Sequence, residues 1–231
     1  MSSGLTARAA GPPLPPSIAG ITIPDSSAAT QAVAQAYEVE DPQVFRHSAR
    51  SFVFAELISQ ARSIKHDPET VFISAILHDI GLSKEYPAPH QRFEIAGADI
   101  AKGLVAGAHA GSPQAQIAWD AVVLHSIYSI ARFKEPEVML VSAGVITDVG
   151  AAFVPFLQKS AVQQVLAALP RAGFNAAFLT VLTDYARRKP DTVSGTFVED
   201  IAMHTVPGYS RGDFYESMQQ PDAFEKQGFT Q

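Results

Sequence analysis

Residues 71–80 read VFISAILHDI, and this stretch decides the fold. Its apolar residues leave almost no polar side on a helix, which is typical of a helix at the centre of a bundle. Residues 138–149 are similarly apolar all round. His78 and Asp79 interrupt the apolar run, and a buried carboxylate without a partner is very costly. The stretch therefore predicts a buried helix and a polar pair that needs a cation or strong hydrogen bonds.

Proline after a capping residue marks several helix starts. Asp41-Pro42 and Asp67-Pro68 each place an N-cap side chain before a proline at the first helical position. Ser112-Pro113 and Glu135-Pro136 repeat the signal, with Glu135 the weaker cap. The helix that begins at Pro42 is expected to run to about Lys65.

The other segments are also expected to be helical. An Ala-rich helix is expected from Asp25 to near Glu38, and amphipathic helices over 159–168 and 174–188. No run shows the sustained period-two alternation of a strand, so we predict an all-α fold.

A single domain accounts for the whole pattern, because no internal repeat or long interior linker is present. We expect a helical bundle over residues 21–205, a flexible N-terminal extension over 1–20 and a loosely structured tail over 206–231.

Composition narrows the functional classes. The chain has 231 residues, a net charge of −6 and no cysteine, which excludes disulfides and thiolate metal sites. No Lys/Arg cluster favours nucleic acid, and no basic amphipathic segment or long apolar span favours a membrane. The first residues lack the apolar region of a secretory signal. We expect a cytoplasmic protein with a small-molecule substrate, no nucleic-acid or membrane partner, and a homodimer as an open alternative.

Further ionisable groups interrupt apolar helices. Asp148 lies within VITDV at 145–149, and His125 follows VVL at 122–124. His47 shares a helical face with Ser51, Phe54 and Ile58, so it can point inward. Two imidazoles and two carboxylates make a nitrogen and oxygen site for a divalent transition metal, and the four candidates are His47, His78, Asp79 and Asp148.

The order of these residues resembles the HD-domain metalloenzyme superfamily, whose signature is a His, a His-Asp pair on a following helix and a distant Asp. The resemblance implies that His47, His78, Asp79 and Asp148 are metal ligands. A closer resemblance, to the HD subgroup that includes cyanamide hydratase, covers about residues 18–153. It is carried by PDS at 24–26, HSAR at 47–50, LHDIGL at 77–82, RFEIAGAD at 92–99, AWDAVVLH at 118–125 and KEPEV at 134–138.

One departure from a related branch bears on the number of metal ions. The dinuclear HD-GYP phosphodiesterases have a His four residues before a Gly-Ala pair, where this chain has Phe93 before Gly97-Ala98. They also have a His-His pair where this chain offers His125 alone. We therefore expect a mononuclear centre, with Zn²⁺ as the first choice of metal and Fe²⁺ as the alternative.

Three residues are candidates for proton transfer. His125 could be a further ligand, a general acid or base, or a core histidine, and we favour the acid–base role because histidine titrates near neutral pH. Glu94 could be a base beside the ligands or a surface residue in the first turn of its helix. Lys84 could replace either, although an exposed lysine usually faces solvent. His66-Asp67 is a second His-Asp pair, but Asp67 already has an N-cap role, so we do not expect it to bind metal.

Three functions fit these residues. The resemblance implies a metal-dependent hydratase or hydrolase of a small molecule, which could add water to a nitrile such as cyanamide to give urea. An HD-type phosphohydrolase acting on a nucleotide or phosphoester is the alternative, but it needs cations to bind phosphate and few lie near the candidate ligands. A non-catalytic binding protein stabilised by the metal is the third.

Overall fold

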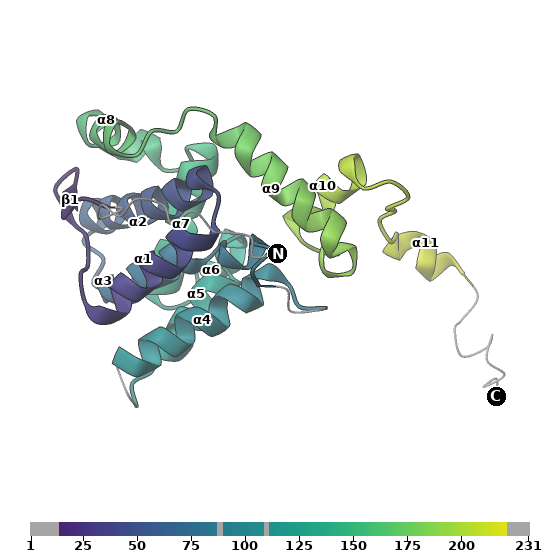
Figure 1. The fold of residues 1–231 in the computed structure, drawn as a ribbon, viewed down its shortest axis with the longest axis horizontal. Helices are drawn as coiled ribbons and strands as arrows, with labels where there is room; N and C mark the ends of the chain where they lie inside the picture. The colour runs from purple at the N-terminus through teal and green to yellow at the C-terminus, as the bar shows by residue number, and fades with distance from the viewer. Residues whose placement is uncertain (1–13, 87–89, 109–110, 221–231) are drawn as a thin grey trace, which may run out of the picture. The chain divides into compact units, whose positions relative to one another are not determined.

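The computed structural model describes residues 14–86, 90–108 and 111–220. Within them helices predominate and the strands are two residues long each, so the predicted all-α fold is confirmed (Figure 1). The elements are β1 (Ser17–Ile18), β2 (Ile21–Thr22), α1 (Ser27–Val39), α2 (Pro42–Arg62), α3 (Pro68–Leu77), η1 (Ile80–Leu82), α4 (Phe93–Ala108), α5 (Gln114–Val123), α6 (Tyr128–Ala131), α7 (Pro136–Gly150), η2 (Val154–Phe156), α8 (Lys159–Ala168), α9 (Phe174–Arg188), η3 (Pro190–Thr192), α10 (Phe197–Thr205) and α11 (Phe214–Gln219).

The chain divides into two compact units, residues 1–181 and 182–231, with the division inside α9. In the predicted extension over 1–20, residues 1–13 lie outside the described residues. Ser17 and Ile18 pair antiparallel with β2, and Ile18 is buried. In the predicted tail over 206–231, Phe214–Gln219 form α11, and residues 221–231 lie outside the described residues.

Three of the predicted capping residues start helices of the first unit, whereas the prediction was wrong for Ser112, because Pro113 is the N-cap residue of α5, and Glu135 makes no side-chain cap bond to α7. The carboxylate of Asp41 accepts a hydrogen bond from the backbone N–H of Gln43 at 2.7 Å, and that of Asp67 accepts from Glu69 at 3.1 Å. Ser26 caps α1 through the N–H of Ala29 at 3.1 Å. Each cap satisfies a backbone donor that a helix leaves free in its first turn, which fixes where the helix begins.

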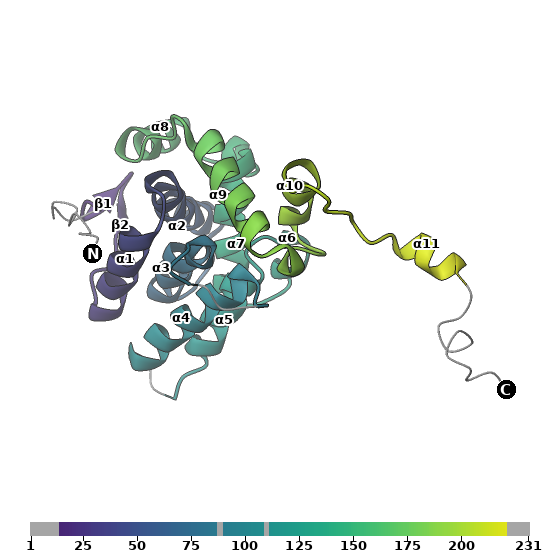
Figure 2. The same cartoon turned by 45° about the vertical axis from the view of Figure 1, so that its right-hand side comes forward.

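Helix α3 lies at the centre of the first unit, as its apolar sequence predicts. Every residue from Thr70 to Leu77 is buried. Helices α1, α2, α4, α5 and α7 all pack against it, and Figures 1 and 2 show α2 beside α7 and α4 beside α5. The end of α3 is therefore surrounded by protein, which is where the candidate ligands gather.

Helices α2 and α7 approach closely at Gly144. A Cβ atom added there would lie 2.1 Å from the carbonyl oxygen of Ser51 and 3.2 Å from the Cβ of Ala55. Because the obstructing atom is backbone, a side chain at 144 would force the two helices apart. Since His47 and Asp148 lie on these helices, their separation depends on this contact.

We expect Gly144→Ala to destabilise the protein by about 1–3 kcal/mol, since overpacking outweighs the helical preference of alanine. Urea unfolding followed by circular dichroism measures the change. Gly150→Ala, on the same helix, is the matched control, because nothing lies within 4 Å of a Cβ built at Gly150. Equal stability of the two variants would contradict the close contact.

The second unit has its own polar contacts. The hydroxyl groups of Tyr185 and Thr192 hydrogen-bond at 2.7 Å, and the Glu199 carboxylate accepts from the Tyr209 hydroxyl at 3.1 Å. In neither unit do the described residues include a helix with the length and apolar character needed to cross a membrane.

Candidate metal centre

The His78-Asp79 pair lies at the end of α3 rather than inside it. The helix ends at Leu77, His78 is its C-cap residue, and Asp79 has φ −104° and ψ 0°. The turn is compact because Gly81 lies against the backbone of Phe93, where an added Cβ would be 2.2 Å from the carbonyl oxygen. Since the pair sits in a turn, its side chains need not diverge as neighbours on a helix do.

Three of the four predicted ligands converge on one point. The Nε2 atom of His78 lies 3.2 Å from Asp79 Oδ2, and that of His47 lies 3.8 Å from the same oxygen. The two Nε2 atoms are 3.2 Å apart. Among the described residues, His47, His78 and Asp79 form the one group of three such side chains that could hold a metal ion, and all three are buried.

Each histidine is fixed through its other ring nitrogen. His78 Nδ1 contacts the carbonyl oxygen of Ala75 at 2.7 Å, and His47 Nδ1 contacts Asp148 Oδ2 at 2.7 Å. A carbonyl or carboxylate oxygen can only accept, so both Nδ1 atoms donate. Their neutral rings then present bare Nε2 lone pairs, which is the usual arrangement of a histidine that binds metal.

The converging atoms form a strongly electron-rich cluster. Two bare nitrogens face each other, and both oxygens of the buried Asp79 carboxylate lack a hydrogen-bond partner. Buried polar groups are normally paired, so this arrangement calls for a cation. The donor set of imidazole and carboxylate suits a divalent transition metal. His47, His78 and Asp79 therefore fit a divalent metal ion.

The pKa shifts show that these buried groups interact strongly with one another. Burial alone would raise the pKa of Asp79, but the surrounding histidines, His78 foremost, lower it. Burial lowers the pKa of His47, whereas for His78 burial is outweighed by the Asp79 carboxylate, the Ala75 carbonyl and Asp148 together, which raise the pKa. A histidine nitrogen must be unprotonated to bind a metal, so metal and proton compete for the same lone pairs.

Asp148 is placed beside the cluster, on the far side of the His47 ring. Besides His47 Nδ1, its carboxylate contacts Arg50 through Nε at 2.6 Å and Nη2 at 2.8 Å. Burial would raise the pKa of Asp148, but the hydrogen bonds from His47 and Arg50 lower it to about 2. The carboxylate is thus placed to orient His47, and it is not among the three converging ligands. Its ligation of the metal stays a prediction.

His125 approaches the cluster from the end of α5. Its Nδ1 donates to the Val122 carbonyl at 2.7 Å, and its Nε2 lies 3.9 Å from Asp79 Oδ1. Burial lowers the pKa of His125 to about 3, so the ring is neutral with a bare Nε2. This geometry favours a role as ligand or base and disfavours one as proton donor.

The other two candidate catalytic residues, Glu94 and Lys84, differ in burial. Glu94 is buried and forms an ion pair with Arg92, whose Nε lies 3.2 Å from Oε2, so it is not a surface residue. Lys84 is exposed in the turn after η1. Neither belongs to the converging group.

The second His-Asp pair has the structural role that its sequence predicts. His66 Nε2 contacts Glu56 at 2.7 Å, and this hydrogen bond raises the pKa of His66. Asp67 caps α3. Neither residue belongs to the group that could hold a metal.

Aromatic side chains enclose the histidines. The ring centroids of Phe174 and Phe178 lie 5.1 Å and 5.6 Å from that of His47, and Phe93 lies 5.7 Å from His125. Phe93 thus places an apolar ring beside His125. Such walls exclude water and favour a compact substrate.

Comparison with protein families agrees with this geometry. Residues 44–139 match the HD domain model. This match supports a relationship to the HD-domain superfamily, whose members are generally metal-dependent hydrolases. The matched HD domain contains His47, His78, Asp79 and His125, whereas Asp148 lies beyond it. No curated protein matches the chain.

Sequence reasoning missed two buried charged residues. Arg50 is fully buried against Asp148. Its place one turn after His47 on the same helical face was the available signal. Glu40 is also buried, and both of its carboxyl oxygens lack a hydrogen-bond partner. Its position between two helices gave no such signal.

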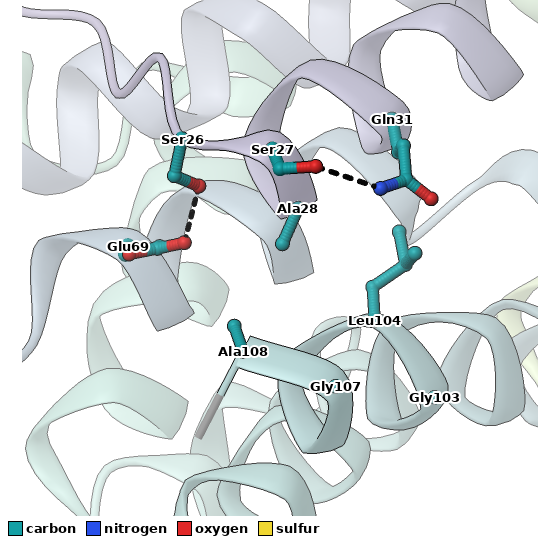
Figure 3. A pocket seen from close by; sticks show the side chains of 9 residues that line it. All are labelled: Ser26, Ser27, Ala28, Gln31, Glu69, Gly103, Leu104, Gly107 and Ala108. Carbon is teal, nitrogen blue, oxygen red and sulfur yellow. Dashed lines mark hydrogen bonds between the residues drawn. The ribbon is translucent and has the colours of Figure 1, made fainter. Parts of the chain in front are cut away.

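A separate surface cavity lies away from these residues. It has a volume of about 540 Å³ and lies between the first residues of α1, Glu69 and the end of α4 (Figure 3). Ser26 and Glu69 hydrogen-bond to each other at 2.5 Å within it, and the α4 side is lined by Leu104 and by small residues. No candidate ligand lines it, so we do not assign the reaction to this cavity.

Proposed function

We propose that the protein is a metal-dependent hydratase or hydrolase of a small uncharged molecule, and that it adds water to a nitrile such as cyanamide to form urea. The observation that carries the proposal is the convergence of bare Nε2 atoms on the unpartnered Asp79 carboxylate. His47, His78 and Asp79 would hold the metal, with His125 as a fourth ligand or a base.

For this chemistry the protein orients the metal ligands and surrounds them with apolar side chains. A divalent metal bound at these residues would polarise water or substrate and make water a stronger nucleophile near neutral pH. Asp148 and the Ala75 carbonyl hold the two histidines in the orientation that ligation needs. Phe93, Phe174 and Phe178 supply apolar walls that keep bulk water out.

The state of the cations near the cluster favours an uncharged substrate over a phosphorylated one. Phosphate recognition needs positively charged groups that are free to bind its oxygens. Arg50 is bonded through two nitrogens to Asp148, Arg92 is paired with Glu94, and Lys84 is exposed to solvent. These three cations are therefore committed elsewhere or directed to water.

The test combines metal analysis with a cyanamide-to-urea assay on the same purified sample. We expect about one divalent metal ion per chain, most often zinc, together with urea formation that chelation abolishes and metal restores. One metal without turnover of cyanamide or other small nitriles would contradict the hydratase proposal. A coordination shell with no position for water would then favour a non-catalytic protein.

A phosphohydrolase is a second candidate because one cation is not committed. The Nε atom of Arg46, next to His47, is buried without a hydrogen-bond partner. The Arg46 guanidinium offers a donor that could bind a phosphate oxygen. Phosphate release from a panel of nucleotides, lost in Arg46→Gln but not in Arg62→Gln, would favour this function over hydration.

A further inference from the structure

Six aromatic rings form one connected set around the proposed ligands. Its members are His47, His78, Phe93, His125, Phe174 and Phe178. Each ring contacts the next, with centroid separations of 4.7–5.7 Å. Phe178 is partly exposed, whereas each of the other five residues is at most 2% exposed. Within the described part of the chain, this set of rings therefore reaches the surface at Phe178.

Hydrogen bonds hold the stretch before α9 against α2 and α7. Arg50 on α2 donates through Nη1 to the carbonyl oxygens of Leu169 and Pro170, at 3.3 Å and 3.4 Å. Arg171 donates through Nε and Nη2 to two carbonyl oxygens in the last turn of α7, at 3.1 Å each. These two helices bear His47 and its carboxylate partner. The first turns of α9 are therefore fixed beside the proposed metal centre.

Phe174 and Phe178 lie one turn apart on α9 and stack on each other, with ring centroids 5.2 Å apart and 19° between the planes. Phe174 is the inner of the two, and the guanidinium carbons of Arg50 and Arg171 lie 5.4 Å and 4.8 Å from its centroid. Phe178 is the outer ring, and its centroid lies 5.6 Å from that of the fully buried His47, in the same compact unit. Since a partly exposed side chain changes rotamer more readily than a buried one, Phe178 is the ring of this set that moves most easily.

We propose that Phe178 is a specificity-determining residue, whose ring covers His47 and admits only compact molecules to the metal centre. The inference rests on the proposed function and deepens it, because it limits the substrate class to nitriles with a small substituent, such as cyanamide. The ring selects by volume and apolar surface rather than by charge, and it takes no part in bond making or breaking. Phe178 lies outside the matched HD domain, residues 44–139, so its replacement leaves the proposed ligands in place.

Phe178→Ala and Phe178→Trp test the proposal on two substrates that share the reacting group, cyanamide and the bulkier phenylcyanamide. We expect Phe178→Ala to raise kcat/KM for phenylcyanamide, relative to that for cyanamide, by about 10- to 200-fold, which is what small differences of fit in an apolar pocket are worth. Phe178→Trp should lower the same ratio. Leu179→Ala is the matched control, because Leu179 is the next residue on α9 and is 49% exposed, and it should leave the ratio unchanged.

A second readout is independent of turnover. Each variant is loaded with zinc and mixed with the chromogenic chelator pyridylazoresorcinol, and the rate of zinc removal is followed by absorbance. Because the chelator must pass the ring to reach the metal, removal should be several-fold faster from Phe178→Ala than from wild type, and slower from Phe178→Trp. A ring with a purely structural role would give the same direction in both variants, since a cavity and overpacking both destabilise a fold.

The outcomes separate the two proposals. If wild type forms urea, but the alanine and tryptophan variants match its substrate ratio and its rate of zinc removal, the role of Phe178 is overturned and the hydratase function stands. Rates of zinc removal that change in the same direction in both variants also overturn that role. If wild type with its full metal complement forms no urea, the proposed function fails, and the order of the zinc-removal rates still decides whether Phe178 covers the centre.

Discussion

His78→Ala is expected to lose the metal ion and, with it, activity on the order of 1000-fold or more, because the metal supplies several kcal/mol of transition-state stabilisation. His78 Nε2 lies 3.2 Å from both His47 Nε2 and Asp79 Oδ2, so its removal opens the middle of the cluster. Metal content by mass spectrometry and turnover measured on the same sample give the result.

Loss of the metal should also lower stability. A ligand at about 1000 times its dissociation constant stabilises the folded state by about 4 kcal/mol, so chelation should lower the unfolding midpoint of wild type but not of His78→Ala. His204→Ala is the matched control, because His204 is exposed on α10 and should behave as wild type. Full metal retention by His78→Ala would contradict the proposed site.

Arg50→Met is expected to destabilise the protein by about 3–5 kcal/mol, since it leaves the buried Asp148 carboxylate without its cation. Arg50 is fully buried, and two of its nitrogens contact Asp148. Methionine approximates the length of the arginine side chain, so the loss of stability chiefly reflects the loss of the positive charge. Urea unfolding measures the difference.

Two further variants distinguish loss of the Arg50–Asp148 ion pair from the effect of replacing any arginine on this helix. Arg62→Met, on the same helix but exposed, should change stability by less than about 1 kcal/mol. Arg50→Met combined with Asp148→Leu should recover part of the loss, because a buried pair can be replaced by apolar residues more readily than broken. A single Arg50→Met variant as stable as Arg62→Met would rule out a major role for the pair.

Local signals explain why the helices could be predicted from sequence. Asp41 and Asp67 precede prolines, and the hydrogen bond that each makes lies within two residues of it. Such signals depend only on neighbouring residues, so they can be recognised without knowledge of the tertiary fold. The two-residue strands β1 and β2 gave no periodic pattern, because they are too short to show alternation.

The ligand cluster was only partly accessible from sequence. His47, His78 and Asp79 stand out because they interrupt apolar helices, and they do converge. The contact of Asp148 with His47 joins residues 101 positions apart, and its geometry depends on how α2 and α7 pack. A pattern therefore identified Asp148 as a buried polar residue near the site, but not which of its neighbours it contacts.

His78 and His125 share a feature with an electrostatic consequence. Each follows the last turn of a helix and bonds through Nδ1 to the carbonyl three residues earlier, Ala75 in α3 and Val122 in α5. The carboxyl end of a helix carries a partial negative charge of about half an electron. Two helix dipoles thus end beside the ligands and add a field that draws cations inward. The same field opposes the entry of anions, so the backbone itself contributes to discrimination among substrates.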